Sequence, residues 1–200
     1  VFVDNGGNIA IKNATINNCI AEESGGGIYI NQTMNLSMTS GTISNCSAHY
    51  GGGIFLNNSG HTFTFGGTAS ITGCQTVWNP IFSAPHYPAG GGIYANGGSL
   101  IVNGTADITD CVSVYHGGGI STTVGTSLEI SPTAGHEVIS GCVAKTTTVD
   151  QNGNHEGSGG AIIAGGSVAY NSGIIRNCEA GNNAGGVFMD GNSTLQMNGG

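Results

Sequence analysis

The sequence predicts an all-β protein, a right-handed parallel β-helix built from about seven rungs with three short strands each. Three observations predict this fold. A glycine block followed by a β-forming residue recurs along the chain, an Ile-x-x-Cys motif recurs before these blocks, and short runs of alternating hydrophobicity lie between the two. No stretch shows a sustained helical period with capping residues.

The glycine blocks set the period of the repeat. They begin at residues 25, 51, 90, 117, 159 and 185, so their spacings are 26, 39, 27, 42 and 26. We interpret the two long spacings as one repeat of 26 residues plus an insertion. Glycine suits the corners of such a repeat, because the backbone there takes positive φ or passes close to the neighbouring rung.

The Ile-x-x-Cys motif places one cysteine at the same position of each repeat. The six copies are Ile16–Cys19, Ile43–Cys46, Ile71–Cys74, Ile108–Cys111, Ile139–Cys142 and Ile175–Cys178. Stacked parallel strands point equivalent side chains the same way, which disfavours the ~90° torsion of a disulfide. Zinc needs ligands that converge tetrahedrally rather than line up. We therefore predict an inward ladder of six buried, free cysteines.

The alternating runs complete the repeat. Segments such as 34–38, 62–65, 99–102, 127–130 and 167–170 have the period of two that is typical of strands with one buried face. Short strands cannot bury these faces alone, but successive repeats stacked in register form a continuous core. Asn31, Asn57 and Asn96 follow the first strand of their repeats, where stacked amides can hydrogen-bond along the rod. We treat 1–200 as a single β-helix domain and expect it to be a fragment of a longer solenoid.

These motifs resemble the repeats of polymorphic outer membrane proteins and other adhesin-like bacterial β-helices. That family pairs a GGA-[ILV] motif with an upstream F-x-x-N. Residues 159–162 (GGAI) match the first motif, whereas Ile and Cys stand where Phe and Asn are usual in the second. The resemblance implies a β-helix fold, a secreted or cell-surface location, and adhesion or surface display, but it names no ligand. We expect a glycan or a host or cell-surface protein as the partner.

The charge of the chain excludes some partners. The net charge is −8, and the only three basic residues are Lys12, Lys145 and Arg176. Nucleic acids and anionic membrane surfaces are bound by clustered Lys and Arg, so neither is expected as a partner. No apolar run approaches the ~20 residues of a membrane-spanning helix, so we expect no membrane insertion within this segment.

An aromatic stripe is the first candidate binding feature. The middle residue of each first strand should point outward, and these residues are Phe2, Tyr29, Phe55, Tyr94, Ser121, Ile163 and Phe188. Exposed aromatic side chains suit polysaccharide binding or protein contact. The alternative is that aromatic residues stand here for their β-propensity alone.

The two insertions fall at the same corner, between the cysteine and the glycines. The first, 75–89, contains Trp78, His86 and Tyr87 together with three prolines, and a rigid aromatic loop of this kind could bind a sugar. The alternative is a loop that buries its own aromatic side chains.

The second insertion, 143–158, suggests a calcium site. Asp150, Asn152, Asn154 and Glu156 alternate as the oxygen ligands of calcium loops do. His155 stands where the turn glycine belongs, and Ala161 where the distal Glu belongs, so a solvated hairpin tip is the alternative. Histidines at 49, 86, 116 and 155 also precede glycine blocks, but their offsets differ, which favours dispersed loop residues over a metal site.

The sequence favours a non-catalytic scaffold over an enzyme. The lyases of this fold need basic residues, and glycosidases need two carboxylates across the sugar. Asp107 and Asp110 are close in sequence, but Asp110 occupies the Asn or Gly turn position of its motif, and Asp4 and Asp190 also follow strands. We expect a secreted or cell-surface scaffold that binds carbohydrate through aromatics and loops. A polysaccharide lyase or glycoside hydrolase of the β-helix class is the alternative.

Overall fold

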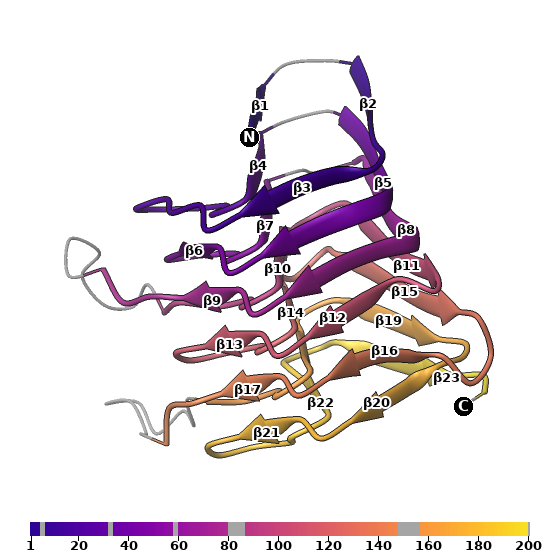
Figure 1. Cartoon of the computed structure of the whole chain (residues 1–200). Helices are drawn as coiled ribbons and strands as arrows, with labels where there is room; N and C mark the ends of the chain where they lie inside the picture. The colour runs from indigo at the N-terminus through magenta and orange to yellow at the C-terminus, as the bar shows by residue number, and fades with distance from the viewer. Residues whose placement is uncertain (5–6, 32–33, 58–59, 80–86, 148–156, 200) are drawn as a thin grey trace.

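The computed structural model describes residues 1–4, 7–31, 34–57, 60–79, 87–147 and 157–199. This part of the chain is all-β and contains no helix; its strands form three sheets in which every pairing is parallel. Neighbouring strands in each sheet come from successive repeats, so the sheets run together along one axis from the indigo end to the yellow end of Figure 1. This confirms the predicted class and the parallel stacking of the repeats.

The first sheet receives the strand that follows each glycine block. Its strands, in order, are β1 (Phe2–Asp4), β4 (Ile28–Asn31), β7 (Ile54–Asn57), β10 (Ile93–Asn96), β14 (Ile120–Thr122), β18 (Ile162–Ala164) and β22 (Val187–Met189). The third sheet is formed by the short strands after each cysteine. They are β6 (Ser47–Ala48), β9 (Gln75–Thr76), β13 (Val112–Ser113), β17 (Val143–Ala144) and β21 (Glu179–Ala180).

The second sheet differs from the expected single strand in each repeat. Its strands are β2 (Gly7–Ile11), β3 (Ala14–Asn17), β5 (Met34–Ser44), β8 (Thr62–Thr72), β11 (Ser99–Gly104), β12 (Asp107–Thr109), β15 (Ser127–Pro132), β16 (Glu137–Ser140), β19 (Ser167–Tyr170), β20 (Ile174–Arg176) and β23 (Thr194–Met197). A repeat therefore contributes either one long strand or two consecutive strands to this sheet. The pairing of β5 with β8 shifts register between Met38 and Ser40, and Gly104 takes a φ of 69° where β11 ends, so the chain bends at this level.

Isoleucine and cysteine form the core beside the glycine blocks. Ile28, Ile54, Ile93, Ile120 and Ile162 occupy equivalent positions of the first sheet and are fully buried. The glycines are needed because successive repeats touch there through their backbones. A Cβ on Gly91 would lie 2.3 Å from the carbonyl oxygen of Gly118, which no side chain tolerates.

The cysteines line up in the core as predicted. All six are free thiols; Cys46, Cys74, Cys111 and Cys142 are buried, and Cys19 and Cys178 are half-buried. The Cys46 thiol donates to the Ser44 carbonyl at 3.3 Å. Burial raises the pKa of the Cys46 thiol to about 11, so this sulfur is held as an unreactive thiol rather than a thiolate.

The residue before each cysteine turns the chain in the left-handed conformation. This position is held by Asn18, Asn45, Gly73, Asp110, Gly141 and Asn177, with φ between 52° and 63°. Asparagine, aspartate and glycine tolerate this conformation best. Asp110 is thus a turn residue, as the motif predicts. No helix in the described part of the chain is long and apolar enough to cross a membrane.

Candidate binding site

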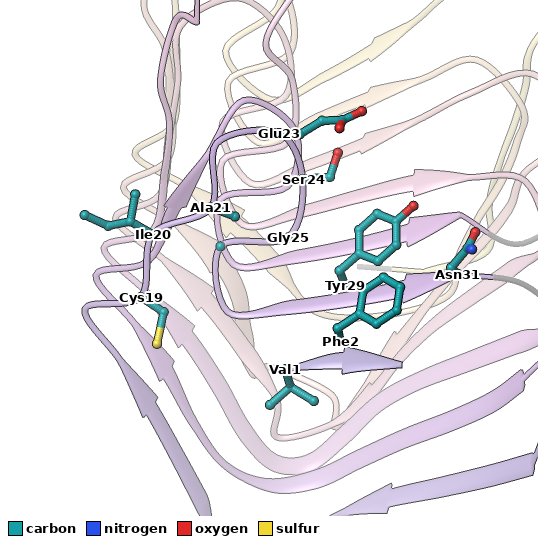
Figure 2. A pocket seen from close by; sticks show the side chains of 11 residues that line it. Val1, Phe2, Cys19, Ile20, Ala21, Glu23, Ser24, Gly25, Tyr29 and Asn31 are labelled. Atoms are coloured by element: carbon teal, nitrogen blue, oxygen red, sulfur yellow. The ribbon is translucent and has the colours of Figure 1, made fainter. Parts of the chain in front are cut away.

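The outer face of the first sheet carries a column of side chains in strict register, which we call the aromatic column. The parallel pairings align, in order, Phe2, Tyr29, Phe55, Tyr94, Ser121, Ile163 and Phe188. The first four rings stack face to face, with centroids 5.2, 5.2 and 5.3 Å apart and interplanar angles of 6°, 1° and 3°. Figure 2 shows the Phe2 and Tyr29 rings lying one above the other. Parallel strand spacing brings the rings into this stack.

Exposure along the aromatic column is less uniform than the sequence predicts. Phe2 is 66% exposed, but Phe55 is only 8% exposed, so the expectation of an exposed ring is wrong at Phe55. The stacked rings of Tyr29 and Tyr94 cover its two faces, and the Tyr50 ring lies beside it at a centroid distance of 6.3 Å. Tyr29 and Tyr94 are half-buried. The aromatic column thus exposes less ring surface at these three positions than the sequence predicts.

A hollow of about 440 Å³ opens where the aromatic column loses its rings. Ser121 and Ile163 form its floor, and they are 5% and 8% exposed. Its volume lies within the ~300–1,000 Å³ of ligand pockets. The residues around the hollow are Tyr50, Tyr87, Ala89, Tyr94, His116, Ser121, Thr122, Thr123, Val124, Ile163, Gly165 and Asp190.

The corner before the glycine blocks forms one side of the hollow. Parallel bridges align Ser24, Tyr50, Ala89 and His116 at this position in successive repeats. The small Ala89 follows Tyr50 in this row, and the Tyr50 ring leans over Tyr94 with centroids 5.2 Å apart and a 46° tilt. Tyr87 packs edge-on to His116 at 6.3 Å, so aromatic rings line this side.

The residues that follow the strands form the opposite side, beside a hydrogen-bonded row that we call the amide column. Asn31 donates to Asp4 at 3.2 Å, Asn57 to Asn31 at 3.1 Å, and Asn96 to Asn57 at 3.1 Å. Thr123 then donates to Asn96 at 3.0 Å. These bonds confirm the predicted stacking of the amides along the rod.

The amide column is interrupted beside the hollow. Thr123, Gly165 and Asp190 come directly after β14, β18 and β22, so glycine stands where the next polar side chain would be. A Cβ on Gly165 would lie 2.9 Å from the Val124 amide nitrogen. The turn after Thr123 therefore occupies the space of that side chain. The exposed Asp190 carboxylate lies beyond the break.

Burial keeps two phenols of the hollow protonated. It raises the pKa of Tyr94 to about 12, with a smaller contribution from Tyr50. It also raises the pKa of Tyr50, together with the nearby Glu23 carboxylate. The folded structure therefore favours the neutral phenol at both positions, an effect that matters only at alkaline pH.

The structure describes the two ends of the first insertion, residues 75–79 and 87–89. The Trp78 ring is 43% exposed and packs 6.0 Å from His49 and 5.8 Å from Tyr115, while Tyr87 packs 4.9 Å from Tyr115. His49 is fully buried, and its Nδ1 accepts the Asn79 amide at 3.3 Å. The aromatic side chains of the two described ends therefore pack at this corner. Of these aromatic side chains, Tyr87 lines the hollow.

Several predicted residues lie outside the described part of the chain. They are His86, Asp150, Asn152, Asn154, His155 and Glu156, so the calcium prediction stays a prediction. In the described ranges, no three His, Cys, Asp or Glu side chains are grouped to hold a metal ion. Asp107 accepts a hydrogen bond from Ser70 at 2.6 Å in the second sheet, away from the hollow.

Sequence reasoning missed Tyr50 and Tyr115 at the aromatic corner. It placed His116 before a glycine block and Asp190 after a strand, but it did not connect either residue with the hollow. Tyr50 and His116 each stand directly before a glycine block, at 51 and 117. Aligning the repeats on the glycines would have put them in one row. The lean of Tyr50 over Tyr94 depends on the small neighbour Ala89, and no motif signals it.

A second hollow, of about 570 Å³, lies at the opposite end of the first sheet (Figure 2). It is lined by the edge strand β1, which pairs with β4 alone, and by the segment around Cys19 to Gly26. Ile20, on its rim, is 80% exposed. The hollow over Ser121 is the stronger candidate, because paired strands form its floor and three tyrosines surround it.

Comparison of the chain with protein-family models, with curated proteins and with solved structures finds no match.

Proposed function

We propose that this chain is part of a right-handed parallel β-helix that binds carbohydrate without catalysis, in an adhesin-like protein that is secreted or displayed on a cell surface. Successive repeats supply successive strands of three parallel sheets, as a β-helix requires. Connections between parallel strands of one sheet are right-handed in about 98% of cases, which supports the handedness. The resemblance of residues 159–162 to adhesin repeats supports the placement.

The hollow over Ser121 is the observation that carries the binding proposal. Sugar rings have apolar C–H faces that pack on aromatic rings, and their hydroxyl groups need polar partners. The hollow offers the rings of Tyr50, Tyr87 and Tyr94 for the first contact. It offers Ser121 and Asp190 for the second.

The charged groups support binding rather than cleavage. Glycosidases place two carboxylates roughly 5–9.5 Å apart across the scissile bond. Among the described residues around the hollow, Asp190 is the single carboxylate, and neither Lys nor Arg joins it. The alternative, a polysaccharide lyase or glycoside hydrolase, would need acidic or basic groups that these residues do not supply.

A glycan array probed with the full chain tests the proposal, followed by a turnover assay on every glycan that binds. The matched variants are Tyr94→Ala, at the hollow, and Tyr29→Ala, in the same column beyond it. We expect Tyr94→Ala to weaken binding roughly tenfold or more, since losing an aromatic anchor costs more than ~1.4 kcal/mol. Tyr29→Ala should leave affinity unchanged.

Two results would overturn the proposal. Absence of binding to any glycan removes the carbohydrate function. Release of new reducing ends or unsaturated uronates from a bound glycan would show an enzyme instead.

A further inference from the structure

We infer that the hollow is the position in the aromatic column where a ring is missing, at Ser121, and we call this position the vacant step. A single pyranose ring fills it by lying flat on Tyr94 above Ser121. This inference rests on the proposed carbohydrate function and specifies the bound sugar: a neutral pyranose with equatorial hydroxyl groups. Three features carry it, namely the end of the ring stack, the break in the amide column and the charge around both.

The ring stack ends with one ring face left open. The Tyr94 ring is stacked on Phe55 at 5.3 Å and 3°, so one face is occupied. Register places Ser121 on the other side of it, and Ser121 has no ring to offer. The Tyr50 ring lies 5.2 Å from Tyr94 and 6.3 Å from Phe55. Because Phe55 and Tyr94 are 5.3 Å apart, these distances place the centre of the Tyr50 ring between their levels and not on the side of Ser121. The face of Tyr94 toward Ser121 is therefore available for a flat ligand.

The vacant step has the thickness of one ring. Tyr94 and Ile163 are two strands apart in register, which corresponds to about 9.6 Å at ~4.8 Å for each strand. One ring between them would lie ~4.8 Å from each, close to the 5.2 Å spacing within the existing stack. Ser121 is 5% exposed and closes the floor, so the ligand rests on it rather than passing beneath.

The amide column is interrupted at the adjoining level. Thr123 is its last hydrogen-bonded member, and Gly165 contributes no side chain. Asp190 follows one strand further on and faces the same hollow. The edge of a ring lying on Tyr94 would thus meet hydroxyl and carboxylate groups on the side where the column is broken.

The shape and charge of these groups select the sugar. A pyranose whose hydroxyl groups are all equatorial presents C–H bonds on both faces, whereas one axial hydroxyl leaves a single such face. A ring held between Tyr94 and Ile163 has an apolar neighbour on each side, which favours the all-equatorial sugar. Asp190 repels a carboxylate on the ligand, and among the described residues around the hollow no Lys or Arg compensates. Acidic sugars are therefore disfavoured.

The variant Ser121→Tyr tests the vacant step, with Ser121→Ala as the matched control. A tyrosine at 121 would complete the stack from Tyr94 toward Ile163, so the melting temperature should rise while glycan affinity falls at least tenfold. Ser121→Ala removes the hydroxyl group from the floor without filling the space, so glycan affinity should fall by less than tenfold and the melting temperature should stay near that of wild type. A lower melting temperature, or failure to fold, for Ser121→Tyr would show that the space is not the size of a ring and would overturn the inference.

Binding measurements separate this inference from the proposed function. We would titrate wild type and both variants with cellotetraose, a mannotetraose with axial 2-hydroxyls, and a tetragalacturonate. We expect cellotetraose to bind at least tenfold more tightly than the other two. If a glycan binds wild type and Ser121→Tyr equally, or if tetragalacturonate binds best, the inference fails while carbohydrate binding stands. If no glycan on the array binds, the proposed function itself fails.

Discussion

From β1 to β10 the outer face of the first sheet carries four stacked rings, whereas from β14 to β22 the same register positions carry Ser121, Ile163 and Phe188. The backbone does not change between these two regions, because the parallel pairing continues in register through both. The core does not change either, since isoleucine is buried at equivalent positions on both sides. The comparison shows that the repeat determines the backbone and the core. Single outward-facing residues determine whether the outer surface of the first sheet carries stacked rings or a hollow.

The largest expected difference between the two regions is in stability. Phe55→Ala removes a buried ring from between two stacked neighbours and should lower the free energy of unfolding by about 3 kcal/mol. Ser121→Ala, two strands further along the same column, should stay within about 0.5 kcal/mol of wild type. Chemical denaturation of both variants measures this contrast. Equal losses would show that the two regions are filled alike.

Alkaline pH should lower the stability of the protein through Tyr94, which lies at the boundary between the two regions. The pKa of Tyr94 is raised by burial to about 12, so the fold favours its neutral form. The stabilisation linked to this tyrosine is complete below pH 10, its ordinary pKa, and is lost as the pH rises from about 10 to about 12. Absorbance at 295 nm should show a late-titrating tyrosine that is missing in Tyr94→Phe.

The same variant provides the control for stability. Tyr94→Phe keeps the ring and its stacking, but it has no phenol to ionise. Its melting temperature should fall less between pH 9 and pH 11 than that of wild type. An identical fall in both proteins would place the alkaline sensitivity elsewhere in the chain.

The amide column should show a smaller effect. Asn57→Ala removes one donated and one accepted hydrogen bond, so we expect a loss of about 1–2 kcal/mol. Thr123→Ala, at the break beside the hollow, removes the single bond to Asn96 and should cost about half as much. Thermal melts of the two variants measure the difference. A greater loss at Thr123 would contradict a column that weakens at the break.

The smallest expected change concerns the thiols, because the cysteine ladder runs beneath both regions without interruption. In the native protein, a thiol reagent should modify Cys19 and Cys178 first, while the four buried cysteines react only after denaturation. Ser121→Tyr should leave this pattern unchanged, since the hollow is confined to the outer surface. Full labelling of all six thiols without denaturant would contradict the buried ladder.

The sequence predicts the buried core and the turns of this protein better than its candidate site. Buried positions recur at every repeat, so Ile54 or Cys74 could be assigned from periodicity alone, as could the turn at Asp110. The second sheet was less predictable, because its bends depend on local glycines and a register shift.

The site could be predicted only in part, because it consists of departures from the repeat. Tyr94 was identifiable as an outward ring, and Ser121 as a position without one. The packing of Tyr50 against Tyr94 depends on the orientation of one side chain, and the position of Asp190 beside the hollow depends on the path of the chain after β22. A residue pattern does not encode either feature.

The in-register pairing of the first sheet makes the position of the hollow adjustable in discrete steps. Exchanging a ring and a small residue between neighbouring strands would move the opening along the rod by about 4.8 Å, with the core untouched. Under the proposed function, a few surface substitutions could thus move the sugar-binding position along the first sheet without any change in the core.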